Sequence, residues 1–263
     1  MRMDILSLVR RDFKKAMNLR TLVIWIALAG MGVFFFYTSG GKTKLVESDQ
    51  IEFLALFLPH MIFGSWAVLS SYFDLVSSDR EHNVLDCIIC SGIPKTRIFI
   101  SKVIVAAIMS LVLSFIYMTP VTCVIIGLSG NFAHILVLIQ YLLPLWGYIM
   151  VYATMGMLIS ILARSSKAAL IWSLAIGLLL MPRFFVMIVE GIGKAFGWTT
   201  QMVDNFSLIA PGVMMQALSE VSDISRFSQA SVIFGISIIS FLIIAYLTFI
   251  KQDEYNYGEG SVK

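Results

Sequence analysis

Residues 103–163 read VIVAAIMSLVLSFIYMTPVTCVIIGLSGNFAHILVLIQYLLPLWGYIMVYATMGMLISILA and contain no Lys, Arg, Asp or Glu. A membrane-spanning helix needs about 20 predominantly apolar residues. This stretch of 61 residues is therefore long enough for two crossings. Ser129, Gly130 and Asn131 supply a turn signal near its middle. The stretch predicts a hairpin of two transmembrane helices.

Four further apolar runs of similar length flank this stretch. They are Thr21–Gly41, Phe53–Phe73, the run from Ala168 past Pro182, and Phe227–Ile250. The chain is 59% hydrophobic and only 13% charged, whereas an average soluble domain is about 25% charged. Too few charged side chains are present to cover a soluble surface. We therefore predict an all-α polytopic membrane protein with six transmembrane helices within residues 21–250.

Lysine and arginine are distributed unevenly over the segments between these spans. With the N-terminus inside, 14 of the 19 basic residues lie on the inner side and 5 on the outer side. Cytoplasmic loops retain positive charge. We therefore predict a multi-pass protein of the cell membrane with both termini, including a tail of residues 251–263, in the cytoplasm. The net charge of +3 is too small to indicate a nucleic-acid partner.

The segment after the fifth span, residues 190–226, is long and rich in glycine and apolar residues. It predicts short re-entrant helices, which are tolerated at membrane depth only where protein or water covers their backbone. Arg183 and Glu190 lie two helical turns apart and can face the same side. They can pair, line an outer vestibule or mark the water boundary, and we keep them as candidates for a substrate path.

His60 follows Pro59 inside the second predicted span. An ionisable side chain within the membrane is a candidate functional residue, so His60 joins the candidate substrate path. The alternative is a neutral histidine that hydrogen-bonds to a neighbouring helix. Because His82 and His134 fall in other segments, we expect no metal site formed by the three histidines.

The sequence has no motif of a catalytic centre. It contains no G-x-x-x-x-G-K-[ST] loop and no H-E-x-x-H, so we predict a non-catalytic chain that binds no cofactor itself. Cys87 and Cys90 form a C-x-x-C motif, but zinc needs four ligands and a thioredoxin-like site needs its own fold. We expect both cysteines to pack as small apolar residues on a buried helix face.

Residues 1–20 have the pattern of an amphipathic helix. Apolar side chains share one helical face: Ile5, Leu6, Val9, Phe13, Ala16 and Met17. Basic side chains lie largely on the other face, which is typical of a helix that lies in the membrane interface.

The segment between the second and third spans, residues 74–102, reads DLVSSDREHNVLDCIICSGIPKTRIFISK. Ser78 and Glu81 fit a capping box, and Gly92 with Pro94 ends a helix, so a helix is predicted over residues 79–90. Twelve residues give roughly 18 Å, which is too short to cross a membrane. The predicted polar face is mainly acidic, which suits a protein partner better than an anionic membrane surface.

This segment resembles the permease subunits of ATP-binding-cassette exporters, in the type-2 permease family. The family pattern is a charged start, a short leucine-containing helix, a turn of small residues and proline, a basic residue and a return into the membrane. The matching residues are Arg80-Glu81, Val84-Leu85-Asp86, Gly92-Ile93-Pro94-Lys95-Thr96-Arg97 and Lys102, together with the turn 163–169 and the segment Asn205–Leu218. The sequence departs in having Asp79-Arg80-Glu81-His82 where many relatives carry two glutamates.

The resemblance implies that the short helix is a coupling helix, which docks on a separate ATPase subunit that binds ATP and Mg. It also implies that the helix of residues 1–20 touches this ATPase, which is the alternative to a basic anchor on the membrane surface. Two permease chains, identical or paralogous, and two ATPase chains would form the working unit, with the substrate path between the permeases. We assign coupling to a set of residues in this segment: Glu81, Leu85, Asp86, Ile88 and Pro94. Glu81 and Asp86 would meet polar groups of the ATPase, Leu85 and Ile88 would fill an apolar cleft, and Pro94 would fix the angle to the third span.

The apolar spans favour a hydrophobic or amphipathic cargo, such as a peptide, a lipid-like molecule or a drug, over a small ion. The alternative hypothesis is an ATP-independent immunity or signalling protein of the membrane that uses the short helix as an interaction platform.

Overall fold

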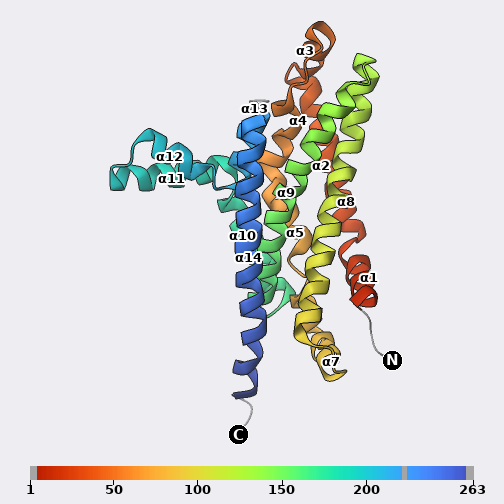
Figure 1. Ribbon diagram of the computed structural model, residues 1–263, viewed down its shortest axis with the longest axis vertical. Coiled ribbons are helices and arrows are strands. Elements are labelled where there is room, and N and C mark those ends of the chain that lie inside the picture. Colours follow the sequence, from red (N-terminus) through yellow and green to blue (C-terminus); the bar gives the residue numbers. More distant parts are fainter. Residues whose placement is uncertain (1–4, 221–223, 259–263) are drawn as a thin grey trace.

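The computed structural model describes residues 5–220 and 224–258, and every regular element in these ranges is a helix (Figure 1). Five helices are long and apolar enough to cross a membrane, or six if one bent pair is a single span. The spans are Leu19–Thr38 (α2), Phe53–Glu81, Lys95–Ser129 (α8), His134–Leu162 (α9) and Phe227–Lys251 within α14 (Ile224–Gly258). This confirms the predicted all-α membrane protein.

The second of these spans is assembled from four consecutive helical segments, and the remaining helices are short. The four segments are α4 (Phe53–Pro59), the π-helix η1 (His60–Gly64), α5 (Ser65–Tyr72) and α6 (Ser77–Glu81). The short helices are α1 (Ile5–Ala16), α3 (Gly41–Ser48), α7 (Val84–Cys90), α10 (Ser166–Leu179), α11 (Pro182–Phe196), α12 (Thr200–Ser207) and α13 (Pro211–Glu220).

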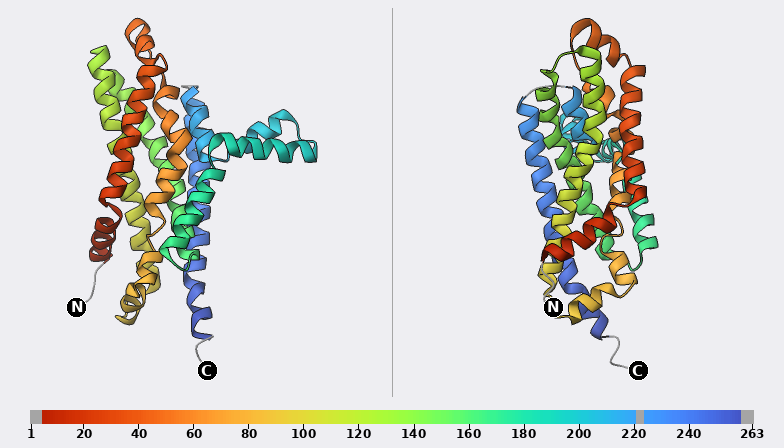
Figure 2. Two further views of the ribbon diagram at one scale, coloured as in Figure 1. Left: turned by 180° about the vertical axis from the view of Figure 1, so that it is seen from behind. Right: turned by 90° about the vertical axis from the view of Figure 1, so that its right-hand side faces the viewer.

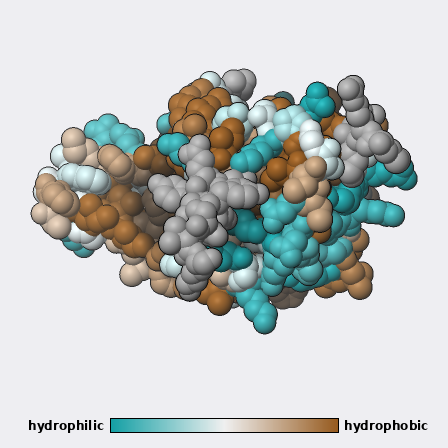
Figure 3. Space-filling view, turned by 90° about the horizontal axis from the view of Figure 1, so that it is seen from below, coloured by the Kyte–Doolittle hydropathy of each residue, from teal (hydrophilic) through white to brown (hydrophobic). Residues whose placement is uncertain are grey.

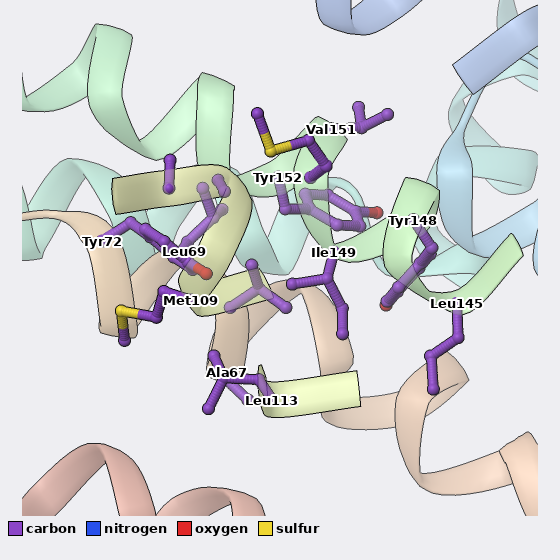
Figure 4. Packing of buried hydrophobic residues seen from close by; sticks show 14 of the residues in the cluster. Ala67, Leu69, Tyr72, Met109, Leu113, Leu145, Tyr148, Ile149, Val151 and Tyr152 are labelled. Carbon is purple, nitrogen blue, oxygen red and sulfur yellow. The ribbon is translucent and has the colours of Figure 1, made fainter. Parts of the chain in front are cut away.

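Helix α9 lies at the centre of the bundle and packs against α14, α8, α5 and α10. Figure 4 shows the packing between these helices, with Tyr72 of α5, Met109 of α8 and Tyr152 of α9 among the buried side chains. The Tyr72 hydroxyl lies 2.9 Å from the Ser110 hydroxyl of α8, so this buried polar group is hydrogen-bonded. The core is therefore formed between the long helices.

The bundle has two distinct ends. Helices α1, α6 and α7 and the last turns of α14 gather at one end, which we call the basal end, and α3 lies at the opposite, distal end (Figures 1 and 2). Helix α1 crosses the base of the bundle instead of running along it (Figure 2). Such a direction is expected of a helix that lies in a membrane interface.

The fifth predicted span differs from the expectation of one helix that runs past Pro182. Helix α10 ends at Leu179, α11 begins at Pro182, and the two axes differ by 67°. Proline is favoured in the first turn of a helix, where its missing N–H group needs no partner. Helices α11 and α12 project sideways from the bundle as an arm (Figure 1). The arm starts at Pro182, earlier than the predicted boundary at residue 190.

The N-terminal helix packs against the bundle through a face that has a polar residue at its middle. Leu8, Asp12 and Ala16 are buried against the bundle, whereas Leu6 is 78% exposed. Their spacing of four residues places the buried three on one face of α1. The apolar periodicity therefore located the helix but not the face that contacts the protein, because an aspartate lies in the middle of that face.

Candidate functional site at the basal end

The segment predicted as one helix over residues 79–90 forms two helices, α6 and α7, and this corrects the prediction. The break lies at Asn83, whose φ of 55° is in the left-handed region. Asparagine tolerates this conformation better than most residues. The predicted capping box is absent as well, because α6 begins at Ser77, one residue before Ser78.

Ser160 of α9 caps the start of α6. Its hydroxyl oxygen accepts hydrogen bonds from the backbone N–H groups of Val76, at 2.9 Å, and Ser77, at 2.8 Å. The first N–H groups of a helix have no partner within the helix, and here a neighbouring transmembrane helix provides one. Because Ser77 and Ser160 are fully buried, this contact fixes α6 against the end of α9.

Arg80 and Glu81 hold α6 to the turn between α9 and α10. The guanidinium of Arg80 donates hydrogen bonds to the carbonyls of Ile161 and Ala163, each at 3.0 Å. The Glu81 carboxylate accepts from the backbone N–H of Ser166 at 3.0 Å. A carboxylate at a helix N-terminus is favoured by the helix dipole. Glu81 therefore stabilises the start of α10 within this chain, although it is exposed to solvent.

Asp79 connects α6 to two further helices. Its carboxylate accepts from Lys15 of α1 at 2.9 Å and from Arg11 of α1 at 3.1 Å. The ammonium of Lys102, near the start of α8, also contacts Asp79 and lies 2.9 Å from the Asp12 carboxylate of α1. The contact between Lys102 and Asp12 is an ion pair without hydrogen-bond geometry.

We call this group of charged side chains the basal ion cluster: Arg11, Asp12, Lys15, Asp79 and Lys102. Lys102 and Asp12 are each only 1% exposed. An isolated buried charge is costly, so buried charges occur in pairs. The cluster joins α1, α6 and α8, and together with Ser160, Arg80 and Glu81 it ties α6 to four neighbouring helices.

Helix α7 presents an outward face different from the one predicted. Leu85 and Ile88 are buried within this chain, at 5% and 6% exposure, so in this structure they are not available to fill a partner's cleft. Asp86, Cys87 and Cys90 are exposed. The expectation that the two cysteines are buried is therefore wrong, because α7 directs the leucine and isoleucine into the core.

Pro94 lies where it was predicted to redirect the chain. It is exposed and stands immediately before α8 in an extended conformation, with φ −63° and ψ 139°. The preceding turn contains Gly92 in the left-handed region, which is the usual conformation of a residue that follows a helix end.

The three candidates for a substrate path do not form one site. His60 is 1% exposed and packs between the rings of Trp25, Tyr117 and Tyr148. Among the described residues, its two ring nitrogens have no hydrogen-bond partner. Arg183 and Glu190 are exposed on α11 in the arm, an element that does not include His60.

An apolar groove of about 310 Å³ lies between α2, α5 and α10. Ile24, Met31, Trp66 and Leu174 are among its lining residues, and none of the three path candidates lines it. Within the ranges given above, no three His, Cys, Asp or Glu side chains are grouped as metal ligands.

Sequence reasoning missed Asp12, Lys102 and Ser160 as site residues. The sequence does contain one signal that Asp12 is buried. Asp12 lies four residues from both Leu8 and Ala16, so the three residues share one face of a helix. A second signal is Lys102, which is the last charge before the 61 uncharged residues. Neither signal identifies the partner in another helix, and Ser160 carries no local signal.

Comparison with known proteins identifies a family for this chain. A family model described as ABC-2 type transporter matches residues 3–202, which is more than half of the chain. A search of curated proteins found no match. The matched region runs from α1 into α12 and includes the basal ion cluster, α6 and α7. The chain therefore belongs to the ABC-2 type transporter family, as a multi-pass transmembrane permease component of transport.

Proposed function

We propose that this chain is the permease subunit of an ATP-driven exporter, and that α6 and α7 together form the element that couples it to a separate ATPase. The basal end would then face the cytoplasm, in agreement with the excess of basic residues on that side. Two ATPase subunits would bind ATP and Mg, and a second permease chain would complete the path. The apolar spans favour a hydrophobic or amphipathic cargo, such as a peptide, a lipid-like molecule or a drug.

One observation carries the proposal: the clamping of α6 to four other helices. Asp79 contacts α1 and α8, Arg80 contacts the end of α9, and Glu81 contacts the start of α10. A displacement of α6 must therefore move these helices or break buried polar contacts, which is costly. Helix α7, which follows α6 after two residues, is the part of this segment with an outward polar face.

The structure changes the roles proposed for individual residues. Asp86 keeps its proposed contact with the ATPase, and the exposed Cys87 and Cys90 take the place of Leu85 and Ile88 as candidate contacts. Leu85 and Ile88 become the residues that anchor α7 to the bundle. Glu81 acts within the chain as a positioning residue at the α9–α10 turn, and Pro94 keeps its proposed role in redirecting the chain into α8.

The proposal is tested by affinity purification of the full chain in mild detergent from its native host. We expect an ATPase subunit to co-purify, and we expect Asp86→Lys to reduce its recovery at least fivefold, because the substitution reverses a charge on the outward face of α7. The matched control is Glu47→Lys on α3, which makes the same charge change at an exposed residue of the distal end. Recovery should be unchanged in this control.

Two outcomes would contradict the proposal. Wild-type chain that is recovered without any ATPase would favour the ATP-independent interaction platform. An equal ATPase recovery for Asp86→Lys and Glu47→Lys would show that α7 is not the docking face. The double substitution Glu81→Lys with Leu85→Asp is a poorer test, because it breaks contacts within the chain itself.

A further inference from the structure

A pocket of about 280 Å³, to which mainly charged and polar residues contribute, opens between α1 and the α6–α7 segment. Its lining residues are Arg11, Lys15, Ser78, Asp79, His82 and Val84. Figure 3 shows this end of the molecule, where hydrophilic residues gather on the side away from the arm while the underside of the arm is hydrophobic. The pocket differs from the apolar groove between α2, α5 and α10 in both chemistry and position.

The charges around this pocket do not balance. The basal ion cluster contains three basic side chains and two carboxylates, which leaves one positive charge in excess. The excess resides at the pocket, because Arg11 and Lys15 are 32% and 33% exposed there, whereas Lys102 is buried behind them. A ligand with a single negative charge would neutralise the cluster.

The two exposed cations also retain unused hydrogen-bond donors. In the described contacts, Arg11 uses Nε and Nη2 on Asp12 and Asp79, and its Nη1 group has no protein partner. Lys15 donates one hydrogen bond, to Asp79, out of the three that an ammonium can donate. A guanidinium beside an ammonium is the donor set that recognises phosphate oxygens.

The position of α1 indicates where such a phosphate would come from. Helix α1 crosses the base of the bundle (Figure 2), and Leu6 at its start is 78% exposed. An apolar side chain exposed on a transverse amphipathic helix is expected to enter the lipid, which brings the polar side of the helix to the level of the headgroups. Inner-leaflet anionic lipids lie at that level.

We propose that this pocket binds the phosphate headgroup of one anionic phospholipid, with Arg11 and Lys15 donating to its phosphate oxygens. The lipid would complete the charge balance of the basal ion cluster and brace α1 against α6. The proposal does not depend on an ATPase, so its test can fail while the proposed function remains correct, and the reverse is also true.

The test measures lipid binding to the purified full chain in detergent by native mass spectrometry, with phosphatidylglycerol as the probe. Phosphatidylcholine and inorganic phosphate are measured in parallel. We expect one phosphatidylglycerol to bind preferentially, and Lys15→Gln to weaken its binding about tenfold, as expected for the loss of a charge-assisted hydrogen bond. The fold should persist, because Lys15→Gln leaves two cations and two carboxylates in the cluster.

The matched control is Lys14→Gln, which removes the same charge from an exposed position next to Lys15 and should change binding by less than about twofold. Lys15→Arg keeps the charge and should retain binding even if Lys15→Gln proves unstable. Equal losses in Lys14→Gln and Lys15→Gln would show diffuse surface attraction and overturn the proposal. Equal binding of phosphatidylcholine, or displacement of the lipid by millimolar inorganic phosphate, would overturn the assignment to an anionic lipid.

Discussion

Lys102 is the residue on which the basal ion cluster depends, because among the described residues its ammonium makes the ion pairs between α8 and the two carboxylates in that cluster. At 1% exposure it has no access to water that could replace these partners. Buried ion pairs add little net stability compared with an apolar core, but the removal of one partner leaves a buried charge uncompensated. We therefore infer that the cluster specifies how α1, α6 and α8 meet.

If the cluster specifies the packing of these helices, a single and a double substitution should change the stability of the chain by different amounts. Lys102→Met should destabilise the chain by on the order of 3 kcal/mol, because both carboxylates lose a buried cation. Lys102→Met with Asp12→Asn removes one charge of each sign, and Asp79 keeps Arg11 and Lys15, so most of the stability should return. Thermal unfolding in detergent measures both effects.

The double variant also tests transmission to α8. If the proposed function holds, it should still bind the ATPase but lose the stimulation of ATP hydrolysis by the permease. The control is Lys102→Arg, which keeps the charge and should retain stimulation. Full stimulation in the folded double variant would show that the contact between α6 and α8 carries no coupling.

Local sequence patterns located α6 and α7 but could not give their contacts. Ser78 and Glu81 have the spacing of a capping box, yet in the folded chain Ser160 caps α6 and Glu81 binds Ser166. A tertiary contact replaced the local one because α9 and α10 meet beside α6. Asn83 was the available signal for a break, since asparagine is enriched in the left-handed region.

The break at Asn83 makes a prediction about α7. Asn83→Gly should leave stability unchanged, because glycine adopts a φ of 55° without strain. Asn83→Val should cost about 1–2 kcal/mol, because a β-branched residue is strained there. The cost should appear as faster amide exchange over α7 and not over α9. Equal exchange in the two variants would mean that the left-handed turn does not orient α7.

The distal end has a contact that depends on pH. The Asp49 carboxylate accepts from His134 at 2.8 Å and from Asn131 at 2.9 Å. These hydrogen bonds, with that from His134 the largest cause, lower the pKa of Asp49 from its ordinary value of 3.8. A carboxylate whose pKa is lowered by folding stabilises the folded state above its ordinary pKa, and this contribution is lost as the pH falls through the lowered value.

We therefore expect the loop between α3 and α4 to remain docked on the α8–α9 turn at neutral pH and to loosen below about pH 4. Amide exchange over residues 41–52 as a function of pH measures this docking. Asp49→Asn should remove the change at acid pH. A variant that still loosened with the same pH profile would assign the effect to another group.

At the scale of the whole molecule, the arm formed by α11 and α12 projects from the bundle and has two faces of different chemistry. Ile188 and Glu190 are both exposed on α11, and two residues correspond to about 200° around a helix, so they lie on opposite faces. Phe184 is also exposed, at 50%, on the side of Ile188. An arm with these two faces is expected to lie along the membrane interface.

Spin labels at the two positions test this placement, in a variant whose three native cysteines are replaced by serine. A label at Ile188→Cys should be relaxed by oxygen dissolved in the bilayer, and one at Glu190→Cys by a water-soluble nickel reagent. Labels that respond alike to the water-soluble reagent would show that the arm stands clear of the membrane.

Hydropathy predicted the membrane spans well because the requirement for about 20 apolar residues acts on each segment by itself. It could not predict the direction of the chain after a span. The bend at Pro182 is an example, since α10 and α11 are both apolar and only their packing sets the 67° between them. Residues 1–4, 221–223 and 259–263 lie outside the described residues; they belong to the predicted N-terminal helix, outer segment and tail.

The break at Asn83 separates the packed helix α6 from the exposed face of α7, and this separation affects how related transporters can diverge. The α6 residues that contact the neighbouring helices, Asp79, Arg80 and Glu81, all precede Asn83, and the exposed residues of α7 follow it. Substitutions on the outer side of α7 can therefore accumulate without disturbing the packed helices. If the proposed function holds, a graft of the α7 surface from a related permease should transfer the choice of ATPase, so that a permease can change its partner by exchanging one short segment.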